Sequence, residues 1–278
     1  HLMMRGFDPA AMLAAIDNRE LGITNIGGVP AMWGAMSLMP NIDDIDFSRI
    51  RVAATGAESV PEPMLKAWQQ RGILLQEVYG MTETSGVVCM AQKTDLPEHM
   101  GYAGRALPYG DVKVMKSEAE EARPGELGEI WMRGASVTPG YWNRPDATAE
   151  TFVGDWLKSG DIGRRDEAGR LSIEDRIKDM YISGGENVYP AEVESVLMAH
   201  PDIREIAVIG VPDAKWGEVG CAVIASISGE PLSLEAIHSQ CEGYLARFKW
   251  PQQVVNVEAL PRNSTGKVQK FVLRQEMA

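Results

Sequence analysis

The stretch Ile-Leu-Leu-Gln-Glu-Val-Tyr-Gly-Met-Thr-Glu-Thr, residues 73–84, joins a strand pattern to a glycine turn. Its apolar first half is typical of a buried strand, and Gly80 ends that strand. Polar side chains follow at once, so hydroxyl and carboxylate groups lie at a strand end. This order of residues indicates a sheet that carries a ligand site at its edge.

The residues upstream repeat this order of elements. A second strand pattern at 51–55 runs into Gly56-Ala57-Glu58, so two glycine turns fall at strand ends. Alternating strands and helices predict a parallel sheet with crossover helices. The predicted elements are a helix that Asp8 caps and Pro9 opens (11–21), a strand (23–26), a helix (30–39), a strand (51–55), a helix (61–71) and a strand (73–79).

Downstream of residue 100 the pattern changes twice. Short strands separated by glycine turns, at 111–116 and 129–133, predict a small antiparallel β-barrel or sheet. After Arg176 strands and helices mix again, and the helix at 234–248 carries a predicted core stripe of Leu234, Ile237, Leu245 and Phe248. We therefore expect an α/β plus α+β chain in three parts: a partial parallel α/β subdomain (1–98), a β-rich barrel subdomain (99–176) and a mobile α+β C-terminal domain (177–278).

Composition narrows the classes of partner. The chain has 278 residues, 45% hydrophobic and 24% charged, as an ordinary globular protein does. Its formal net charge of -12 argues against nucleic acid as the main partner. No apolar run reaches the ~20 residues that span a bilayer, and no targeting pattern opens the chain. Cys89, Cys221 and Cys241 lack a CxxC spacing, which favours free thiols and a cytoplasmic location.

The turn at 79–83 carries groups that suit a nucleotide. Tyr79 offers a flat ring for a base, and Gly80 lets a backbone approach a phosphate. Thr82 offers a hydroxyl and Glu83 a carboxylate for Mg2+. A structural role is also open, in which Thr82 only caps the next turn.

Two later polar motifs also suit either a ligand site or a purely structural function. Asp161, in Lys-Ser-Gly-Asp, suits the two hydroxyls of a ribose or a plain turn. Arg176 and Lys178, in Asp-Arg-Ile-Lys-Asp, suit a site or, respectively, a surface ion pair and a solvated charge.

The C-terminal third contains two glycine-containing loops, and a lysine ends the second of them. Gly184 and Gly185, in Ser-Gly-Gly-Glu-Asn-Val-Tyr-Pro, allow close approach of an extended ligand or form a tight turn. Trp216 serves either as packing or as the wall of a channel. Lys267 ends the polar loop Pro-Arg-Asn-Ser-Thr-Gly-Lys, residues 261–267.

Together these motifs resemble one family, the adenylate-forming enzymes, and in particular the acyl-CoA synthetases. The resemblance covers the chain from about Phe7 to its C-terminus. It rests on eight motifs in the family's order: Gly-Ala-Glu (56–58), Tyr-Gly-Met-Thr-Glu-Thr (79–84), Gly-Glu-Leu-Gly-Glu-Ile (125–130), Gly-Tyr-Trp (140–142), Ser-Gly-Asp (159–161), Asp-Arg-Ile-Lys-Asp (175–179), Gly-Gly-Glu-Asn-Val-Tyr-Pro (184–190) and Ser-Thr-Gly-Lys (264–267).

The resemblance implies an ATP-dependent ligase that joins a carboxylic acid to coenzyme A through an acyl-adenylate, with Mg2+. Lys267 would be the adenylation lysine and Lys178 the hinge of the mobile domain. The remaining implied roles are adenine and AMP binding by Gly56, Ala57, Glu58, Tyr79, Gly80 and Met81, ribose binding by Asp161 and Arg176, phosphate and metal binding by Thr82 and Glu83, and a CoA channel of Ser183, Gly184, Gly185 and Trp216.

The sequence departs from the family in one respect. Family members carry a Ser/Thr/Gly-rich loop that ends in a lysine and wraps the β- and γ-phosphates, and this sequence holds no such segment. We therefore expect a C-terminal portion of a longer protein, inactive in adenylation alone. An open apolar sheet edge would favour a homodimer.

Two other functions stay open: an adenylation module that loads a carrier protein, and a nonenzymatic nucleotide-binding scaffold. The acid is less defined. Small and apolar residues at Gly27, Gly28, Trp33, Val87 and Val88 fit an apolar acid, either aliphatic, such as a fatty acid, or aromatic.

Overall fold

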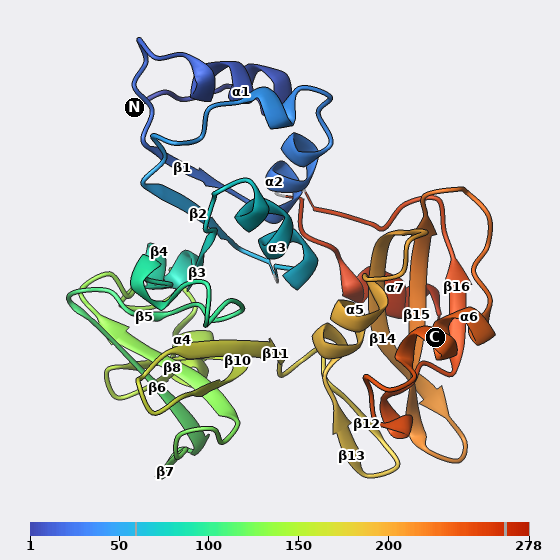
Figure 1. Ribbon diagram of the computed structural model, residues 1–278. Helices are drawn as coiled ribbons and strands as arrows, with labels where there is room; N and C mark the ends of the chain where they lie inside the picture. Colours follow the sequence, from blue (N-terminus) through green and yellow to red (C-terminus); the bar gives the residue numbers. More distant parts are fainter. Residues whose placement is uncertain (59, 264–265, 278) are drawn as a thin grey trace. The chain divides into compact units, whose positions relative to one another are not determined.

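The computed structural model describes residues 1–58, 60–263 and 266–277. The chain divides into two compact units (Figure 1). The N-terminal unit contains His1–Ser159 and Gly163–Ile173, and the C-terminal unit contains Gly160–Ile162 and Glu174–Ala278.

The first sheet of the N-terminal unit has five strands in sequence order. They are β1 (Asn25–Gly28), β2 (Val52–Gly56), β3 (Gln76–Met81), β4 (Gly86–Met90) and β5 (Arg105–Ala106). The first three are parallel, as the sequence predicts, but β4 and β5 run antiparallel. The sequence patterns above predict neither β4 nor β5. Only four residues separate β3 from Gly86, and a connection that short joins antiparallel strands only.

Three helices accompany the parallel strands (Figure 1): α1 (Pro9–Asp17), α2 (Pro30–Ser37) and α3 (Glu62–Gln70). The predicted cap of α1 is confirmed, because Asp8 Oδ1 accepts the Ala11 N–H at 2.9 Å. The core of this layer contains Trp33 and Trp68, whose ring centroids lie 5.0 Å apart in a T-shaped pair. Aromatic burial of this kind stabilises the layer on which the predicted turns stand.

The second sheet of the N-terminal unit is antiparallel and open. Its strands follow the order β11-β10-β8-β6-β7, with β9 paired to β10. The predicted closed barrel is therefore wrong for the described strands. The β7 edge has only two residues, both exposed, and offers too short a ladder to close the sheet. The elements are β6 (Gly110–Ser117), β7 (Glu120–Glu121), β8 (Gly128–Gly134), α4 (Pro145–Thr151), β9 (Phe152–Val153), β10 (Trp156–Arg165) and β11 (Leu171–Arg176).

The C-terminal unit surrounds a long hairpin with helices. The hairpin strands β14 (Ile203–Asp213) and β15 (Gly217–Ser226) pair along their length, and β16 (Gln253–Asn256) pairs parallel to β15. Apolar clusters form two cores in this unit, one around Val208 and one around Val223. The other elements are β12 (Tyr181–Ser183), β13 (Glu186–Val188), α5 (Pro190–Leu197), α6 (Leu234–Cys241) and α7 (Lys270–Glu276).

The predicted helix at 234–248 is too long. Helix α6 ends at Cys241, and Gly243 has a positive φ of 80° that a continuing helix does not allow. Ile237 is fully buried as predicted, but Phe248 is 41% exposed. The single core stripe is therefore wrong at its C-terminal end.

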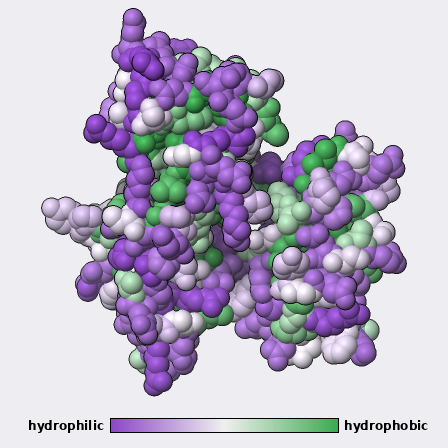
Figure 2. Space-filling model, in the orientation of Figure 1, coloured by the Kyte–Doolittle hydropathy of each residue, from purple (hydrophilic) through white to green (hydrophobic). Residues whose placement is uncertain are grey.

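The described helices are all too short or too polar to cross a membrane. Figure 2 shows small apolar patches (green) among polar side chains (purple) on the N-terminal unit.

Candidate functional site

The turn after β3 is built around a buried threonine. The Thr84 hydroxyl accepts the Met81 N–H at 3.0 Å and lies 2.7 Å from the Gly86 carbonyl oxygen. Thr84, and not Thr82, therefore holds the short helix η2 (Thr82–Thr84) in place. This leaves the exposed Thr82 outside the capping role that the sequence left open.

Both glycines at the predicted site have a packing reason within the sheet. A Cβ on Gly80 would lie 1.9 Å from the Gly86 carbonyl oxygen, and a Cβ on Gly56 would lie 2.3 Å from the Val78 carbonyl oxygen. Either contact is far below van der Waals distance, so only glycine lets these strands approach so closely.

The carboxyl ends of β2 and β3 bring the two predicted turns to one edge. Gly56 pairs with Val78 in the parallel register, one residue before Tyr79. Ala57 follows with a φ of 74°, a left-handed conformation that costs a non-glycine residue about 1–2 kcal/mol. Glu58 is partly exposed beside it, and Ser59 lies outside the described residues. Local strain of this kind concentrates at ligand sites.

The side chains of Tyr79 and Met81 have a second function in packing. Both are partly buried against the apolar cluster that includes Val88, Val114 and Ile130. This cluster joins the two sheets of the N-terminal unit, so the predicted adenine-binding ring stands on a rigid base.

Glu83 is anchored by the loop that follows β8. Its Oε1 accepts the Tyr141 hydroxyl at 2.7 Å, and its backbone oxygen accepts the Thr138 N–H at 2.7 Å. Ser85 adds a third tie, because its hydroxyl donates to the Ser136 carbonyl at 2.9 Å. Sequence reasoning missed Tyr141 as a functional residue. Its Gly-Tyr-Trp motif gives no sign of this contact, because no spacing rule connects residues 58 positions apart.

Burial and the nearby Glu83 carboxylate raise the pKa of Tyr141, which keeps its phenol protonated. The carboxylate of Glu83 could also serve as one ligand of a Mg2+ ion. The described residues contain no cluster of three or more His, Cys, Asp or Glu side chains that could hold a metal ion by themselves. Mg2+ in nucleotide sites is commonly held by one or two carboxylates, with phosphates and waters as the other ligands. A single carboxylate at this turn therefore fits a magnesium ion whose other ligands are phosphates and waters.

The C-terminal unit brings together the two predicted ribose ligands. Arg176 Nε donates to Asp161 Oδ1 at 3.0 Å, although they are 15 positions apart in the chain. They lie on β10 and β11, which are neighbours in the sheet order. The Asp161 side chain is 13% exposed and that of Arg176 is 48% exposed. The pair is thus a real ion pair, and it leaves the guanidinium open to solvent.

The segment around Arg176, residues 175–179, is tied to two helices of the same unit. Asp175 accepts the Ala191 N–H at 2.8 Å at the start of α5. Arg274 of α7 donates to Asp179 Oδ1 at 2.9 Å. Burial raises the pKa of Asp175, and the nearby Lys270 charge opposes that rise. The predicted hinge Lys178 is exposed between these two fixed points.

The glycine loop of this unit packs under a tryptophan. The Gly184 N–H donates to the Trp216 carbonyl at 2.8 Å, and a Cβ on Gly184 would lie 2.9 Å from the indole. Gly184 and Gly185 have positive φ angles of 60° and 90°. Trp216 is 47% exposed, Lys215 stacks 4.5 Å over its ring, and Ser183 is buried. The four predicted channel residues are therefore adjacent.

Lys267 stands on a loop closed by Asn263. The Lys267 N–H donates to Asn263 Oδ1 at 2.9 Å, and the Asn263 N–H donates to the Lys267 carbonyl at 2.9 Å. The Lys267 residue is exposed. Ser264 and Thr265 of the same motif lie outside the described residues. The predicted site residues thus form two sets, one in each unit.

The residues expected near the acyl group are only partly accessible. Trp33 is fully buried, with its indole N–H directed at the carbonyls of Gly28 (3.2 Å) and Ala54 (3.3 Å), and Val88 is 2% exposed. Gly27 and Val87 remain exposed. Of the five residues, these two therefore present the most surface to a ligand.

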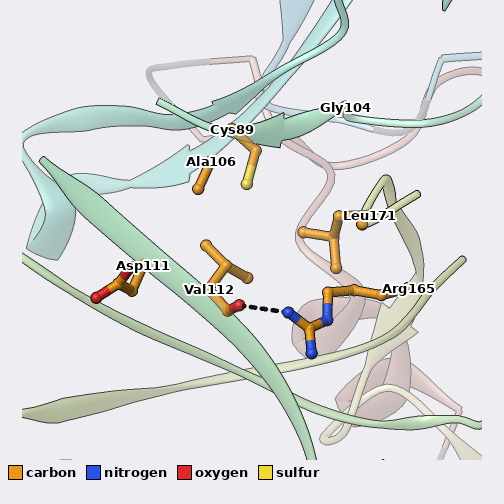
Figure 3. A pocket seen from close by; sticks show the side chains of 8 residues that line it. Cys89, Gly104, Ala106, Asp111, Val112, Arg165 and Leu171 are labelled. Carbon is orange, nitrogen blue, oxygen red and sulfur yellow. Dashed lines mark hydrogen bonds between the residues drawn. The ribbon is translucent and has the colours of Figure 1, made fainter. Parts of the chain in front are cut away.

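A cavity of about 150 Å³ lies apart from the predicted residues, between the two sheets of the N-terminal unit (Figure 3). Arg165 donates to the Val112 carbonyl at 3.0 Å across it. Burial raises the pKa of the Cys89 thiol to about 12, which leaves it unreactive at neutral pH. Cys89, Cys221 and Cys241 are all buried and unpaired. We interpret the cavity as a packing feature.

Comparison with known proteins places these motifs in a family. Residues 1–142 match the family model described as AMP-binding enzyme, and residues 192–267 match the AMP-binding enzyme C-terminal domain. An indoleacetate–CoA ligase from Aromatoleum aromaticum is 38% identical over 272 residues, 98% of this chain and 53% of that protein. A long-chain-fatty-acid–CoA ligase from Mycobacterium tuberculosis is 41% identical over 250 residues, 90% of this chain and 49% of that protein.

Solved structures agree with the sequence relatives. The O-succinylbenzoate coenzyme A synthetase of Bacillus subtilis, in complex with ATP and magnesium ion, matches with a TM-score of 0.86 and 33% identity. The match covers 98% of this chain and 54% of that one. The chain thus spans about half the length of the curated relatives it matches. The two family models together cover most of the chain, which belongs to the AMP-binding enzyme family.

Proposed function

We propose that the protein is an ATP-dependent acid–CoA ligase that works through an acyl-adenylate. The observation that carries this proposal is the meeting of two polar turns, Gly56–Glu58 and Tyr79–Glu83, at the carboxyl edge of β2 and β3. We further propose the three-part division at residues 98 and 176, with a mobile part from residue 177.

In the first step, a carboxylate oxygen of the acid attacks the α-phosphorus of ATP, and pyrophosphate leaves. Both reactants are anions, so a cation between them stabilises the transition state more than the separated reactants. We assign that function to Lys267. Glu83 would hold the Mg2+ that neutralises the leaving pyrophosphate, with Thr82 as a hydroxyl ligand of the phosphates.

The remaining residues of the N-terminal set would bind adenine, through the 56–58 backbone and Tyr79. Asp161 suits the ribose hydroxyls because its carboxylate accepts hydrogen bonds. Its partner Arg176 holds that carboxylate in place through the 3.0 Å contact of Nε with Oδ1.

In the second step, the CoA thiol sulfur attacks the acyl carbon and AMP leaves, while the thiol proton is released. The thiol needs a narrow path, and the Gly184-Gly185 loop with Trp216 offers a surface without side chains beside an aromatic wall. Lys178 would be the hinge that exchanges Lys267 for this loop.

The test is Lys267→Ala in the intact enzyme. We expect exchange of pyrophosphate with ATP to fall at least about 100-fold, as for loss of a key electrostatic group. Thioester formation from supplied acyl-adenylate should persist. Lys66→Ala, at an exposed lysine of α3, is the matched control and should change neither rate.

Other outcomes of the same assays point elsewhere. Equal loss of both half-reactions would contradict the separate function of Lys267. Thioester formation on a carrier-protein thiol, but not on CoA, would favour a carrier-loading module. Absence of any AMP or acyl-adenylate binding would favour a noncatalytic scaffold.

For the acid, we propose an apolar body, aliphatic or aromatic. The relatives are named for indoleacetate and long-chain fatty acids, and the exposed Gly27 and Val87 offer no charge to bind a polar substrate. Homodimer formation and a cytoplasmic location stay predictions.

A further inference from the structure

We propose that Tyr141 is a positioning residue that orients the Glu83 carboxylate for the metal–nucleotide complex. The proposal rests on the function proposed above, in which Glu83 holds Mg2+. It starts from the 2.7 Å hydrogen bond between the Tyr141 hydroxyl and Glu83 Oε1. A glutamate on a turn otherwise samples several rotamers, and a bond to one oxygen removes much of that freedom.

The loop that carries Tyr141 is itself fixed. The Tyr141 N–H donates to the Thr148 hydroxyl at 2.9 Å, and that hydroxyl donates to the Arg144 carbonyl at 2.8 Å. Thr148 lies on α4, so the tyrosine backbone is bound to a helix. The phenol therefore reaches Glu83 from a rigid support.

Gly140 allows this close fit. Its φ is 150°, and a Cβ there would lie 2.7 Å from the Thr148 methyl group. The loop is tied to the Glu83 turn a second time, because the Thr138 N–H donates to the Glu83 carbonyl at 2.7 Å. Backbone and side chain of Glu83 are thus both held by one loop.

The chemistry of the partner matters as much as its position. A lysine or arginine at this place would neutralise the carboxylate and compete with a cation. A phenol is neutral and takes one of about four acceptor positions on the two oxygens, so the full negative charge stays for Mg2+.

The experiment compares Tyr141→Phe with wild type in the intact enzyme, by pyrophosphate exchange at varied Mg2+. The Mg2+ concentration for half-maximal rate should rise roughly tenfold, since a hydrogen bond to a charged group at a partly exposed site contributes near the lower end of its range. The rate at saturating Mg2+ should stay within about twofold of wild type, and AMP binding without metal should not change.

Two variants separate the possible failures. Tyr109→Phe removes a hydroxyl from a tyrosine that is 91% exposed, and it should leave the Mg2+ dependence unchanged. Glu83→Gln should raise the Mg2+ concentration for half-maximal rate more than Tyr141→Phe does. An unchanged Mg2+ dependence in Tyr141→Phe, with Glu83→Gln impaired, would overturn the positioning function alone. An unchanged Mg2+ dependence in Glu83→Gln would reject the metal function of Glu83 and the positioning proposal with it.

Discussion

Glu77 is the most strongly perturbed carboxyl of the candidate region. It precedes Tyr79 by two residues on β3 and accepts the Gly101 N–H at 2.7 Å. Burial raises its pKa from 4.5 to about 7, although the Gly101 hydrogen bond opposes the rise. The folded protein therefore keeps a proton on Glu77 at pH values where the unfolded chain has released it.

We predict that Glu77→Gln removes a pH dependence of stability. Below about pH 4.5 the Glu77 carboxyl is protonated in both the folded and the unfolded state. Between about pH 4.5 and about pH 7 it is protonated only in the folded state, so the free energy of unfolding of wild type falls as pH rises. Relative to the variant, the loss should be on the order of 3 kcal/mol and level off above pH 7.

Urea unfolding of the chain from pH 4.5 to 8 measures this difference. Glu98→Gln is the control, because Glu98 is exposed on the nearby turn. The same change in the free energy of unfolding with pH in wild type and Glu77→Gln would contradict the raised pKa of Glu77.

At the scale of elements, α7 is the helix that binds its unit together. Lys270 and Arg274 lie one turn apart and pair with Glu194 (2.6 Å) and Asp179 (2.9 Å). Glu194 Oε1 also accepts the Val208 N–H at 2.7 Å, so the ion pair links α7, α5 and β14. Both Lys270 and Glu194 are largely shielded, with side chains 16% and 21% exposed.

We predict a coupling free energy of about 1–2 kcal/mol between Lys270 and Glu194 in a double-mutant cycle with Lys270→Ala and Glu194→Gln. The Glu62–Lys66 pair of α3 is the control. It has the same 2.6 Å distance, but its side chains are 63% and 62% exposed. Its coupling should be only about 0.3–0.5 kcal/mol because solvent screens it. Equal couplings would show that burial does not decide the strength of these pairs.

At the scale of the molecule, each unit closes its own apolar cores. Leu65 belongs to a cluster made only of N-terminal unit residues, and Leu197 to one made only of C-terminal unit residues. Each side chain is at most 2% exposed. A unit with its own core can open without the other.

We predict that Leu65→Ala and Leu197→Ala each destabilise one unit by about 2–5 kcal/mol. Hydrogen exchange with mass spectrometry should show faster exchange in α3 and β2 for the first variant, and in α5 and β14 for the second. Leu38→Ala, at a residue 85% exposed, should change little. Faster exchange in both units from either variant would refute the division.

The sequence by itself determined the local elements and the family. The Asp8 cap depends on residues that are near neighbours in the chain, where backbone geometry permits few alternatives. Each family motif is likewise a run of adjacent residues. Two predictions are wrong, the barrel and the helix that runs to residue 248. The sheet stays open at β7, and α6 ends at Cys241 where a loop begins.

Only the tertiary structure decided which side chains meet. Asp161 and Arg176 pair because β10 and β11 are sheet neighbours, and Tyr141 reaches Glu83 because a loop packs on the η2 turn. Such contacts between distant residues depend on the packing of whole elements, and no local pattern encodes them. The local sequence thus determines which functional groups the chain carries, while its tertiary packing determines which of those groups lie within hydrogen-bonding distance.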